Sequence, residues 1–409
     1  MPRSILPLTI QSNDHTDNRG FPHEEHGAPA PRACVRKVPL LLDTYKQFAQ
    51  ASIGAAFGWL AVYLSTGGFL DEIDVENENP DSLAGEIGAG IETLQSRVER
   101  YGKAKSRALD VADFIRELAG MQVHAGVQVA ATAQRSDRPS TDGDRAAYSR
   151  QRESRKALRV LGHRVANCGY YLEFSHYHTI DEVRLTKAYL CAKHLLCPLC
   201  AIRRGSKALG AYLERWEYIQ PEKTSLKPFL VTLTVKDGDD LAERFEHLYK
   251  SQQELWKRKQ RGLGSVLDGV DGAVWSYEVK RGANSGSWHP HLHMVALAES
   301  EPSQAALSKE WHDITGDSFI VDVRPISQAD PVSGFIEVFK YAVKFSDQSP
   351  ADTYHCFKVL GGRRLIGSAG VFRGVQIPQQ LTDEPFDDLP FVRLFYRFIR
   401  GAYSQVTTA

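Results

Sequence analysis

The chain has 409 residues, of which 42% are hydrophobic and 24% are charged, a composition typical of soluble proteins with a buried core. Its 50 basic and 50 acidic residues cancel, so net charge by itself indicates no class of partner. Six cysteines are too few for a disulfide framework in a chain of this length. Four of them cluster, which favours a metal site in a reducing compartment and predicts a cytoplasmic location.

The N-terminal third contains no recognisable chemistry. Residues 1–40 are polar and aperiodic, which predicts a disordered tail, and no signal peptide is visible. Residues 41–140 have the helical spacing of an accessory or partner-binding region, with a polar linker at 133–147. The apolar stretch 47–70 is the one membrane candidate, but its glycines and small residues favour a buried helix. No stable membrane association is therefore expected.

Residues 150–220 are predicted to form a basic, zinc-binding element. Six basic residues fall between Arg150 and Arg164, opposed only by Glu153. Such a run is often a solvated helix face, but here it leads into a cysteine cluster, which favours a phosphate-binding surface. The predicted structural zinc ligands are Cys168, Cys191, Cys197 and Cys200.

The cysteine pattern leaves two alternatives. His163 or His194 could replace one cysteine as a zinc ligand, and the pair Cys197 and Cys200 could instead be a redox motif. The spare cysteines nearby favour zinc. A helix is predicted to begin directly afterwards and to reach about Trp216, and its first turns carry three candidate DNA phosphate contacts: Arg203, Arg204 and Lys207.

The most informative stretch is a predicted strand at 288–297. Alternate residues of a strand share a face, so His289, His291 and His293 lie together on one side, with apolar residues on the other. Two neutral imidazoles on one face are a natural pair of metal ligands, although histidines on the solvent side of a strand are the simpler alternative. A preceding strand at 272–279 predicts an antiparallel hairpin that places Glu278 beside the histidines as third ligand, or as a plain surface carboxylate.

The remaining elements indicate an α+β fold. A strand at 228–235 precedes the hairpin, and a helix, a strand and a second helix are expected at 303–315, 318–326 and 334–345. Residues 226–378 are therefore predicted to form one domain of strands and helices around this hairpin. Residues 379–409 are treated as a C-terminal tail without a role.

The predicted helix over 334–345 carries three polar side chains on one face. Glu337 and Tyr341 are four residues apart, and Lys344 lies three residues further on. Tyrosine on an amphipathic helix is usually a boundary residue, and Lys344 could be a solvated lysine. Their occurrence together, downstream of a histidine strand, favours a catalytic group.

Taken together, these motifs resemble a known family. Phe229–Val235 (FLVTLTV), His289–His293 (HPHLH) and the Glu-x-x-Lys-Tyr-x-x-Lys pattern of 337–344 resemble, in this order, the motifs of plasmid rolling-circle replication initiators. These proteins are single-tyrosine HUH endonucleases with a ferredoxin/RRM-like fold, so the resemblance implies a central antiparallel sheet with helices packed on it over residues 226–378. The cysteine element and the Arg363-Arg364 segment are also similar, so that the resemblance covers roughly residues 155–375. Five residues separate Cys191 from Cys197, one more than is usual in that family.

The resemblance implies a mechanism. His291, His293 and Glu278 would hold Mg²⁺ or Mn²⁺, with the imidazoles favouring Mn²⁺, and His289 would orient them or touch the DNA phosphate. Tyr341 would cleave one strand, forming a 5′-phosphotyrosine and leaving a 3′-OH that primes synthesis. Glu337 would activate water for hydrolytic termination, and Lys344 would stabilise phosphate charge.

The implied partners are plasmid origin DNA, as a single-stranded or hairpin nick site, and the host polymerase and helicase, since the chain lacks a Walker-type loop. An HUH transposase would share the chemistry, whereas a relaxase usually has its nucleophile before the histidines. The alternative from another class is a zinc-dependent DNA-binding protein without catalysis.

Overall fold

The computed structural model describes residues 93–120, 122–124, 127–129, 142–282, 285–340 and 348–406. The chain divides into two units, Met1–Val75 and Glu76–Ala409, and every described residue belongs to the second. The predicted tail at 1–40 and the apolar stretch at 47–70 lie outside the described residues. Among the helices that are described, none combines the length and apolar content needed to cross a membrane.

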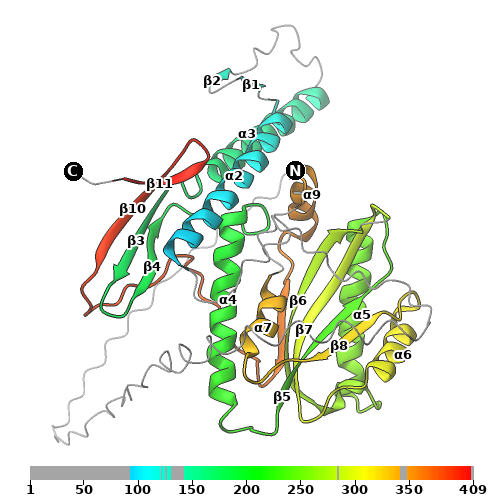
Figure 1. The fold of residues 1–409 in the computed structure, drawn as a ribbon. Coiled ribbons are helices and arrows are strands. Elements are labelled where there is room, and N and C mark those ends of the chain that lie inside the picture. The colour runs from blue at the N-terminus through cyan, green and yellow to red at the C-terminus, as the bar shows by residue number, and fades with distance from the viewer. Residues whose placement is uncertain are drawn as a thin grey trace, which may run out of the picture. The chain divides into compact units, whose positions relative to one another are not determined.

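A five-stranded sheet forms the centre of the C-terminal half (Figure 1). Its strands run in the order β8-β5-β7-β6-β9, and every neighbouring pair is antiparallel. The strands are β5 (Lys227–Thr234), β6 (Val270–Arg281), β7 (Trp288–Ala298), β8 (Val321–Pro325) and β9 (Ile366–Gly370). The central antiparallel sheet is therefore confirmed. So is the predicted hairpin, because β6 pairs with β7 and places Glu278 opposite His291.

Helices cover both faces of this sheet (Figure 1). One face packs against α5 (Leu241–Gln260) and α6 (Gln304–Thr315), and Leu292 and Met294 belong to this core, as their alternation with the histidines predicts. The other face packs against α7 (Pro331–Phe339) and α4 (Pro198–Ile219), through residues such as Val295. The histidines lie on this second face. A short 3₁₀ helix, η1 (Val266–Gly269), precedes β6, and a helix that was not predicted, α9 (Pro350–Leu360), adds Cys356 and Leu360 to the first core.

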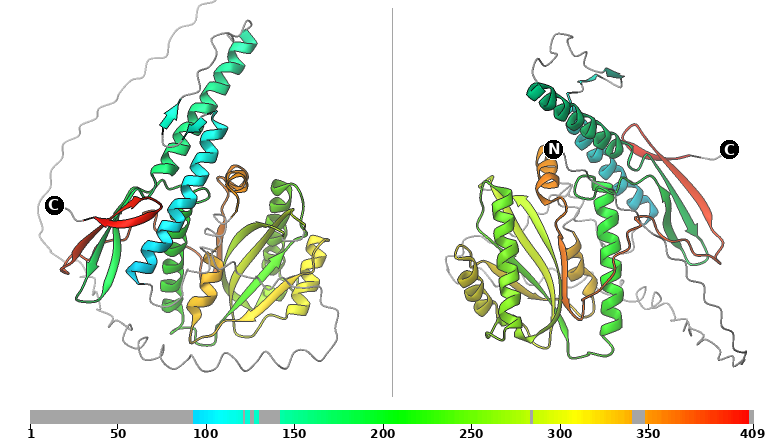
Figure 2. Two further views of the ribbon diagram at one scale, coloured as in Figure 1. Left: turned by 45° about the horizontal axis from the view of Figure 1, so that its top comes forward. Right: turned by 180° about the vertical axis from the view of Figure 1, so that it is seen from behind.

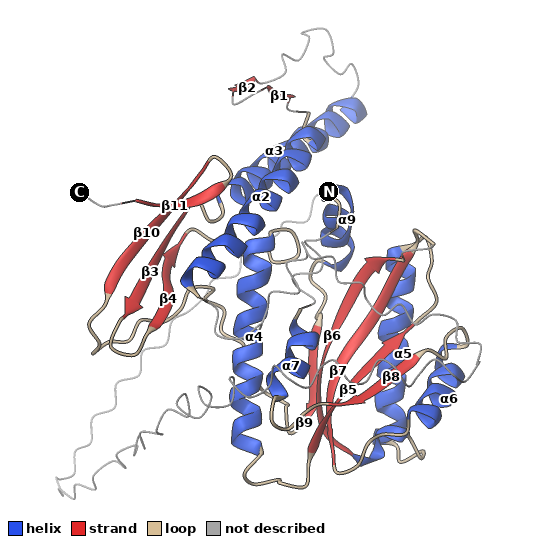
Figure 3. Cartoon of the chain, in the orientation of Figure 1, coloured by secondary structure: helices blue, strands red, loops and turns tan. Residues whose placement is uncertain are grey.

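A second sheet joins segments that are far apart in the sequence (Figure 3). Its order is β11-β10-β3-β4, with all pairs antiparallel, and its strands are β3 (Tyr171–Tyr177), β4 (Glu182–Ala188), β10 (Val392–Ile399) and β11 (Ala402–Val406). The sequence predicted none of these strands and assigned residues 379–409 to a tail. Tyr396 and Tyr403 are buried against the cysteine-containing core. Tyr396 lies in β10, which pairs with β3 some 220 residues earlier, and no local pattern can reveal that pairing.

Two long helices that precede this sheet in the sequence pack against each other (Figure 2). They are α2 (Leu94–Leu118) and α3 (Asp142–Asn167), and α3 confirms the expected basic helix. Gly162 of α3 lies so close to α2 that a Cβ there would be 3.3 Å from the Ala112 carbonyl oxygen. The sequence predicted helix through residue 132, but α2 ends earlier. It is followed by Gly120, at a positive φ of 69°, and the short hairpin of β1 (Gln122–His124) and β2 (Val127–Val129).

Candidate functional site

Three side chains of the β6–β7 hairpin converge on the sheet face that packs against α7. The Nε2 atom of His291 lies 3.4 Å from Glu278 Oε1, and Nε2 of His293 lies 3.5 Å from Glu278 Oε2. All three side chains are buried or nearly so, with Glu278 fully excluded from solvent. One carboxylate therefore faces both imidazoles, as the hairpin register dictates.

The far nitrogens of the two rings have their own neighbours. Nδ1 of His293 is 3.1 Å from the Thr232 hydroxyl, and Nδ1 of His291 is 3.5 Å from the His289 carbonyl oxygen. Thr232 stands opposite His293 in the β5–β7 pairing, on the same face of the sheet. Such contacts orient each ring and leave Nε2 directed at Glu278. The sequence analysis missed Thr232, although its place among alternating polar residues of the first strand was a usable signal.

The geometry and donor chemistry fit a divalent metal ion. The ligand atoms of Glu278, His291 and His293 all lie within 4.8 Å of one another. Burial lowers the pKa of His291 to about 4, against the opposing effect of Glu278, so the imidazole is neutral at pH 7, as a metal ligand must be. Buried Nε2 of His293 has no hydrogen-bond partner among the described residues, and a bound ion would satisfy it.

His289 lies beside this group and has a different partner. Its ring centroid is 5.4 Å from that of His291, but its Nδ1 is hydrogen-bonded to the Asp237 carboxylate. An isolated bridge between Gly238 and Trp288 brings Asp237 to this position. The group of potential metal ligands does not include His289, and about a quarter of its side chain is exposed (24%). The sequence analysis missed Asp237, which it had treated only as the end of a strand.

Helix α7 is anchored on the same face. The Ser276 hydroxyl donates to the Val338 carbonyl oxygen, and Ser276 is two residues from Glu278 on β6. Glu337 of α7 accepts a 2.7 Å bond from the ammonium of Lys340, a pairing that the sequence analysis did not consider. Tyr341 and Lys344, the predicted nucleophile and its neighbour, lie outside the described residues.

The four predicted zinc ligands form a single buried cluster. The sulfur atoms of Cys168, Cys191, Cys197 and Cys200 all lie within 4.8 Å of one another. The sulfur of Cys200 is 3.5 Å from that of Cys168 and 3.6 Å from that of Cys191. Four thiolates around zinc, at roughly 2.3 Å each, stand roughly 3.8 Å apart, so the arrangement fits a tetrahedral zinc ion. Neither His163 nor His194 belongs to this group.

The surroundings act on the thiols of the cluster in opposite directions. Hydrogen bonds from the other three cysteines lower the pKa of Cys191, whereas hydrogen bonds to neighbouring cysteines together with burial raise the pKa values of Cys197 and Cys200. Cys197 precedes α4 as its N-cap, where the helix dipole stabilises negative charge. Lys105 of α2 is buried nearby and donates to the Ala166 carbonyl oxygen. Burial lowers the pKa of Lys105, and the adjacent cysteines oppose that shift, so its positive charge offsets theirs.

The structure corrects the predicted role of Arg203. Its guanidinium is buried and bonds to the Asp383 carboxylate, the Tyr101 hydroxyl and the Leu381 carbonyl oxygen. Because these partners occupy it inside the protein, Arg203 is not available to a DNA phosphate. Lys207 also pairs with Asp383, at 2.8 Å, and Arg204 donates to the Pro378 carbonyl oxygen at 2.8 Å. Both side chains are partly exposed.

Comparison with known proteins identifies the family. The model of the replication protein family matches residues 182–393, slightly more than half of the chain. The chain therefore belongs to that family, and it is a plasmid replication initiator. The match runs from β4 to β10 and includes the His291 cluster and most of the cysteine cluster.

Two relatives, each called Protein rep, resemble this chain. One, from Streptococcus pneumoniae serotype 2 (strain D39 / NCTC 7466), is 27% identical over 257 residues, which cover 57% of this chain and 76% of the relative. The other, from Bacillus amyloliquefaciens, is 22% identical over 262 residues, covering 55% and 75% respectively. No solved structure matches the chain.

Proposed function

We propose that this initiator nicks one strand of plasmid origin DNA through Tyr341, as a single-tyrosine HUH endonuclease. The observation that carries the proposal is the buried group of Glu278, His291 and His293 beside α7, in a chain of the replication protein family. Tyr341 follows Lys340, the C-cap residue of α7. The hydrogen bond from the Ser276 hydroxyl anchors that helix to β6, two residues before Glu278.

The three ligands would hold Mn²⁺ or Mg²⁺, and the two imidazoles favour Mn²⁺. The ion, when bound, supplies Lewis-acid polarisation of the scissile phosphate. Tyrosine in water has a pKa of about 10, so its hydroxyl is a weak nucleophile until it is deprotonated. In the proposed step the tyrosine oxygen bonds to phosphorus, the bond from phosphorus to the 3′ oxygen breaks, and that oxygen takes up a proton. The resulting 3′-OH primes rolling-circle synthesis.

Glu337 is proposed to end the cycle. Its carboxylate would take a proton from water while the water oxygen bonds to the phosphorus of the second phosphodiester, the bond from that phosphorus to the 3′ oxygen breaks, and that oxygen takes up a proton. The 3′-OH released by this hydrolytic step would then attack the phosphotyrosine, which joins the finished strand and frees Tyr341. Lys340 holds that carboxylate at 2.7 Å and fixes its position on α7. Lys344 is proposed to stabilise the phosphate charge.

The cysteine cluster is proposed to hold a structural Zn²⁺ that fixes the start of α4. Arg204 and Lys207 on that helix, together with His289, are the proposed DNA contacts. The proposed partners are origin DNA, as a single-stranded or hairpin nick site, and the host helicase and polymerase. The sequence contains no Walker-type loop that would supply a helicase.

A nicking assay tests the nucleophile. Wild-type protein with Mn²⁺ should relax a supercoiled origin plasmid and become covalently attached to its DNA, and Tyr341→Phe should lose both activities, because phenylalanine has no hydroxyl. Tyr218→Phe, at an exposed tyrosine of α4, is the matched control. An adduct with Tyr341→Phe would exclude this nucleophile. A wild-type protein that binds the origin without cleaving it would support the non-catalytic alternative.

Termination is tested separately at Glu337. Glu337→Ala should keep the first cleavage, because Tyr341 performs that step, and should slow release of the finished strand by roughly a hundredfold, the lower range for loss of a general base. The covalent adduct should then accumulate on denaturing gels. Glu299→Gln, at a carboxylate beyond the end of β7, is the control. Loss of the first cleavage in Glu337→Ala would contradict the assigned role.

A further inference from the structure

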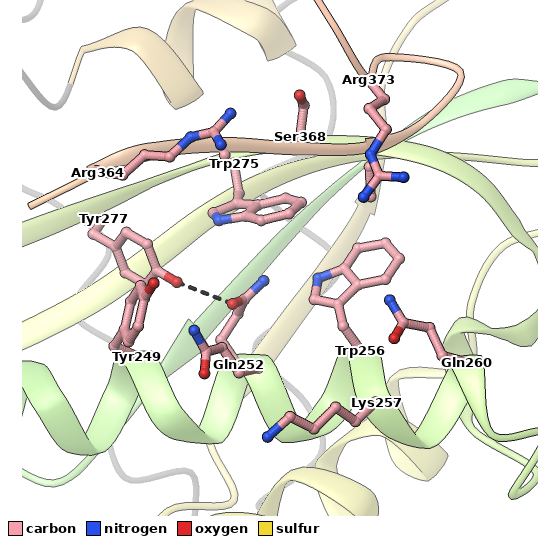
Figure 4. Close-up of a pocket in the computed structure, with 13 residues that line it drawn as sticks. Tyr249, Gln252, Trp256, Lys257, Gln260, Trp275, Tyr277, Arg364, Ser368 and Arg373 are labelled. Carbon is pink, nitrogen blue, oxygen red and sulfur yellow. Dashed lines mark hydrogen bonds between the residues drawn. The ribbon is translucent and has the colours of Figure 1, made fainter.

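A cavity of about 450 Å³ lies between α5, β6 and β9 (Figure 4). Trp275 and Tyr277 of β6 line it, and they alternate along the strand with Ser276 and Glu278. Because alternate residues point to opposite faces, this cavity lies on the face of the sheet opposite the Glu278 group. The proposed nicking chemistry uses none of the residues that line it. Its volume falls within the range of small-ligand sites.

The walls of the cavity are aromatic. The rings of Trp256 and Trp275 lie nearly parallel, with centroids 5.5 Å apart and an interplanar angle of 27°. Tyr249 and Tyr277 form a second pair, with centroids 5.7 Å apart. Gly367 of β9 makes room for this wall, because a Cβ there would lie 2.4 Å from the Trp275 indole. Both tryptophans are half-buried, and aromatic rings that line a cavity in this way are surfaces on which nucleobases stack.

Two hydrogen-bond donors of the cavity have no protein acceptor among the described residues. The side-chain oxygen of Gln252 accepts a 3.0 Å bond from the Tyr277 hydroxyl (Figure 4). Its amide nitrogen is buried and is one of these donors, and the Trp256 indole nitrogen is the other. Gln252 is only 3% exposed, so an unsatisfied N–H there is costly. A ligand that brings oxygen or ring-nitrogen acceptors into the cavity would satisfy both donors.

The rim of the cavity is basic. Lys257, Arg364 and Arg373 line it, and no acidic residue does so in the described part of the chain. The Lys257 ammonium approaches Glu254 only to 3.9 Å, and Arg364 donates to the Ile366 carbonyl oxygen. All three basic side chains are exposed, so they remain accessible to an anion. Aromatic walls, internal donors and a cationic rim together match a planar base that carries a phosphate.

We propose that this cavity binds an unpaired nucleotide, with its base against the tryptophans and its phosphate at the basic rim. Base oxygens or ring nitrogens accept from Gln252 and Trp256. The ligand chemistry is shared by a nucleotide within single-stranded DNA and by a free mononucleotide. The assignment to DNA rests on the proposed function, since an initiator that nicks an origin exposes unpaired nucleotides. The cavity then provides a DNA contact that is separate from the nicking centre.

Binding of a fluorescent 12-nucleotide oligothymidylate, measured by anisotropy at fixed salt, tests the proposal. Trp275→Ala should weaken binding by roughly fivefold or more, because the base can no longer stack on the indole. A salt titration of the exposed rim variant Lys257→Gln/Arg373→Gln, which does not disturb the core, should show a smaller salt dependence of log Kd. The expected decrease is about 0.7 for each phosphate that the variant no longer neutralises. Lys250→Gln, an exposed lysine of α5 outside the cavity, is the matched control and should leave both quantities unchanged.

Two further arms identify the ligand and separate this inference from the nuclease proposal. Unlabelled thymidine monophosphate should compete only at much higher concentration if DNA is the ligand; equal competition per nucleotide would assign the cavity to free nucleotide.

An oligonucleotide containing 5-iododeoxyuridine should crosslink under ultraviolet light to peptides covering 249–277 or 364–373. Glu278→Gln should abolish nicking and keep this crosslink. The inference would be overturned if the wild-type protein nicks DNA, both cavity variants bind the oligonucleotide with unchanged affinity, and no such crosslink forms. If the wild-type protein forms the crosslink but does not nick DNA, only the nuclease proposal would be overturned.

Discussion

At the scale of single residues, burial sets the chemical state of the proposed metal ligands. His291 is 3% exposed and faces Glu278 at 3.4 Å. Loss of solvent penalises the imidazolium more than the carboxylate favours it, so the lowered pKa keeps the ring neutral at physiological pH. The Thr232 and His289 contacts then decide which nitrogen faces Glu278. A histidine strand becomes a metal site only through these neighbours.

The protonation of His291 predicts how stability depends on pH. Its folded pKa of about 4 lies below the ordinary 6.5, so the unfolded chain binds more protons between these values. The free energy of unfolding is therefore expected to be highest above pH 6.5 and to fall by roughly 3 kcal/mol as the pH decreases towards 4. Urea unfolding in EDTA across this range should show the loss. His291→Gln should show a shallower pH dependence, and an unchanged dependence would contradict the assignment.

At the scale of elements, helix α4 connects the two sheets. Cys197 and Pro198 begin it at the cysteine cluster. Further along, Gly205 lets α4 approach α7 so closely that a Cβ there would lie 3.0 Å from the Phe339 carbonyl oxygen. The C-terminal segment adds Asp383, which accepts from Arg203 and Lys207 of α4 and from the Leu185 backbone N–H of β4. Although burial opposes it, Arg203 lowers the pKa of that carboxyl, so Asp383 is charged.

Asp383→Asn should therefore destabilise the protein. The substitution leaves Arg203 buried with no negative partner, and breaking a buried ion pair in this way typically costs about 3 kcal/mol. Chemical denaturation monitored by tryptophan fluorescence measures the difference. Asp388→Asn, an exposed aspartate of the same segment, should change stability by less than about 0.5 kcal/mol. Equal stability of the two variants would show that the Asp383 contact contributes nothing.

At the scale of the whole molecule, two potential metal groups lie in different cores. The Glu278 group lies within the five-stranded sheet, and the cysteines lie in the hydrophobic cluster that packs against the four-stranded sheet. Their donors also differ: sulfur selects zinc, whereas imidazole with carboxylate accepts Mn²⁺. The two sites are therefore expected to fill independently.

Metal analysis of two variants tests this independence. Glu278→Gln should retain one zinc per chain in elemental analysis and bind Mn²⁺ at least about tenfold more weakly by calorimetry. Cys200→Ser should lose the zinc, because one of four ligands is gone, and retain Mn²⁺ binding. Loss of both metals in either variant would show that the sites are coupled.

How much of this could be predicted depends on the range of the interactions. Strand alternation is local, so the sequence by itself determined the β6–β7 hairpin, the shared face of His291 and His293 and the placement of Glu278 beside them. The Cys-x-x-Cys spacing likewise defined half of the cysteine group. The resemblance to the initiator family, and not the order of the strands, implied that the whole sheet is antiparallel.

Only the tertiary structure decided the rest, because it depends on segments distant in the chain. Residues 392–399 (VRLFYRFI) are rich in strand-forming residues, a signal that was not used, but their hydrogen bonds to β3, which complete the second sheet, are not a local property. Arg203 belongs to a basic run that resembles a DNA contact, and it is withdrawn from solvent by Asp383, 180 residues later. The aromatic cavity likewise joins α5 to β9 across the face opposite the histidines. Burial and pairing between such segments are properties of the packed molecule, and no local pattern carries them.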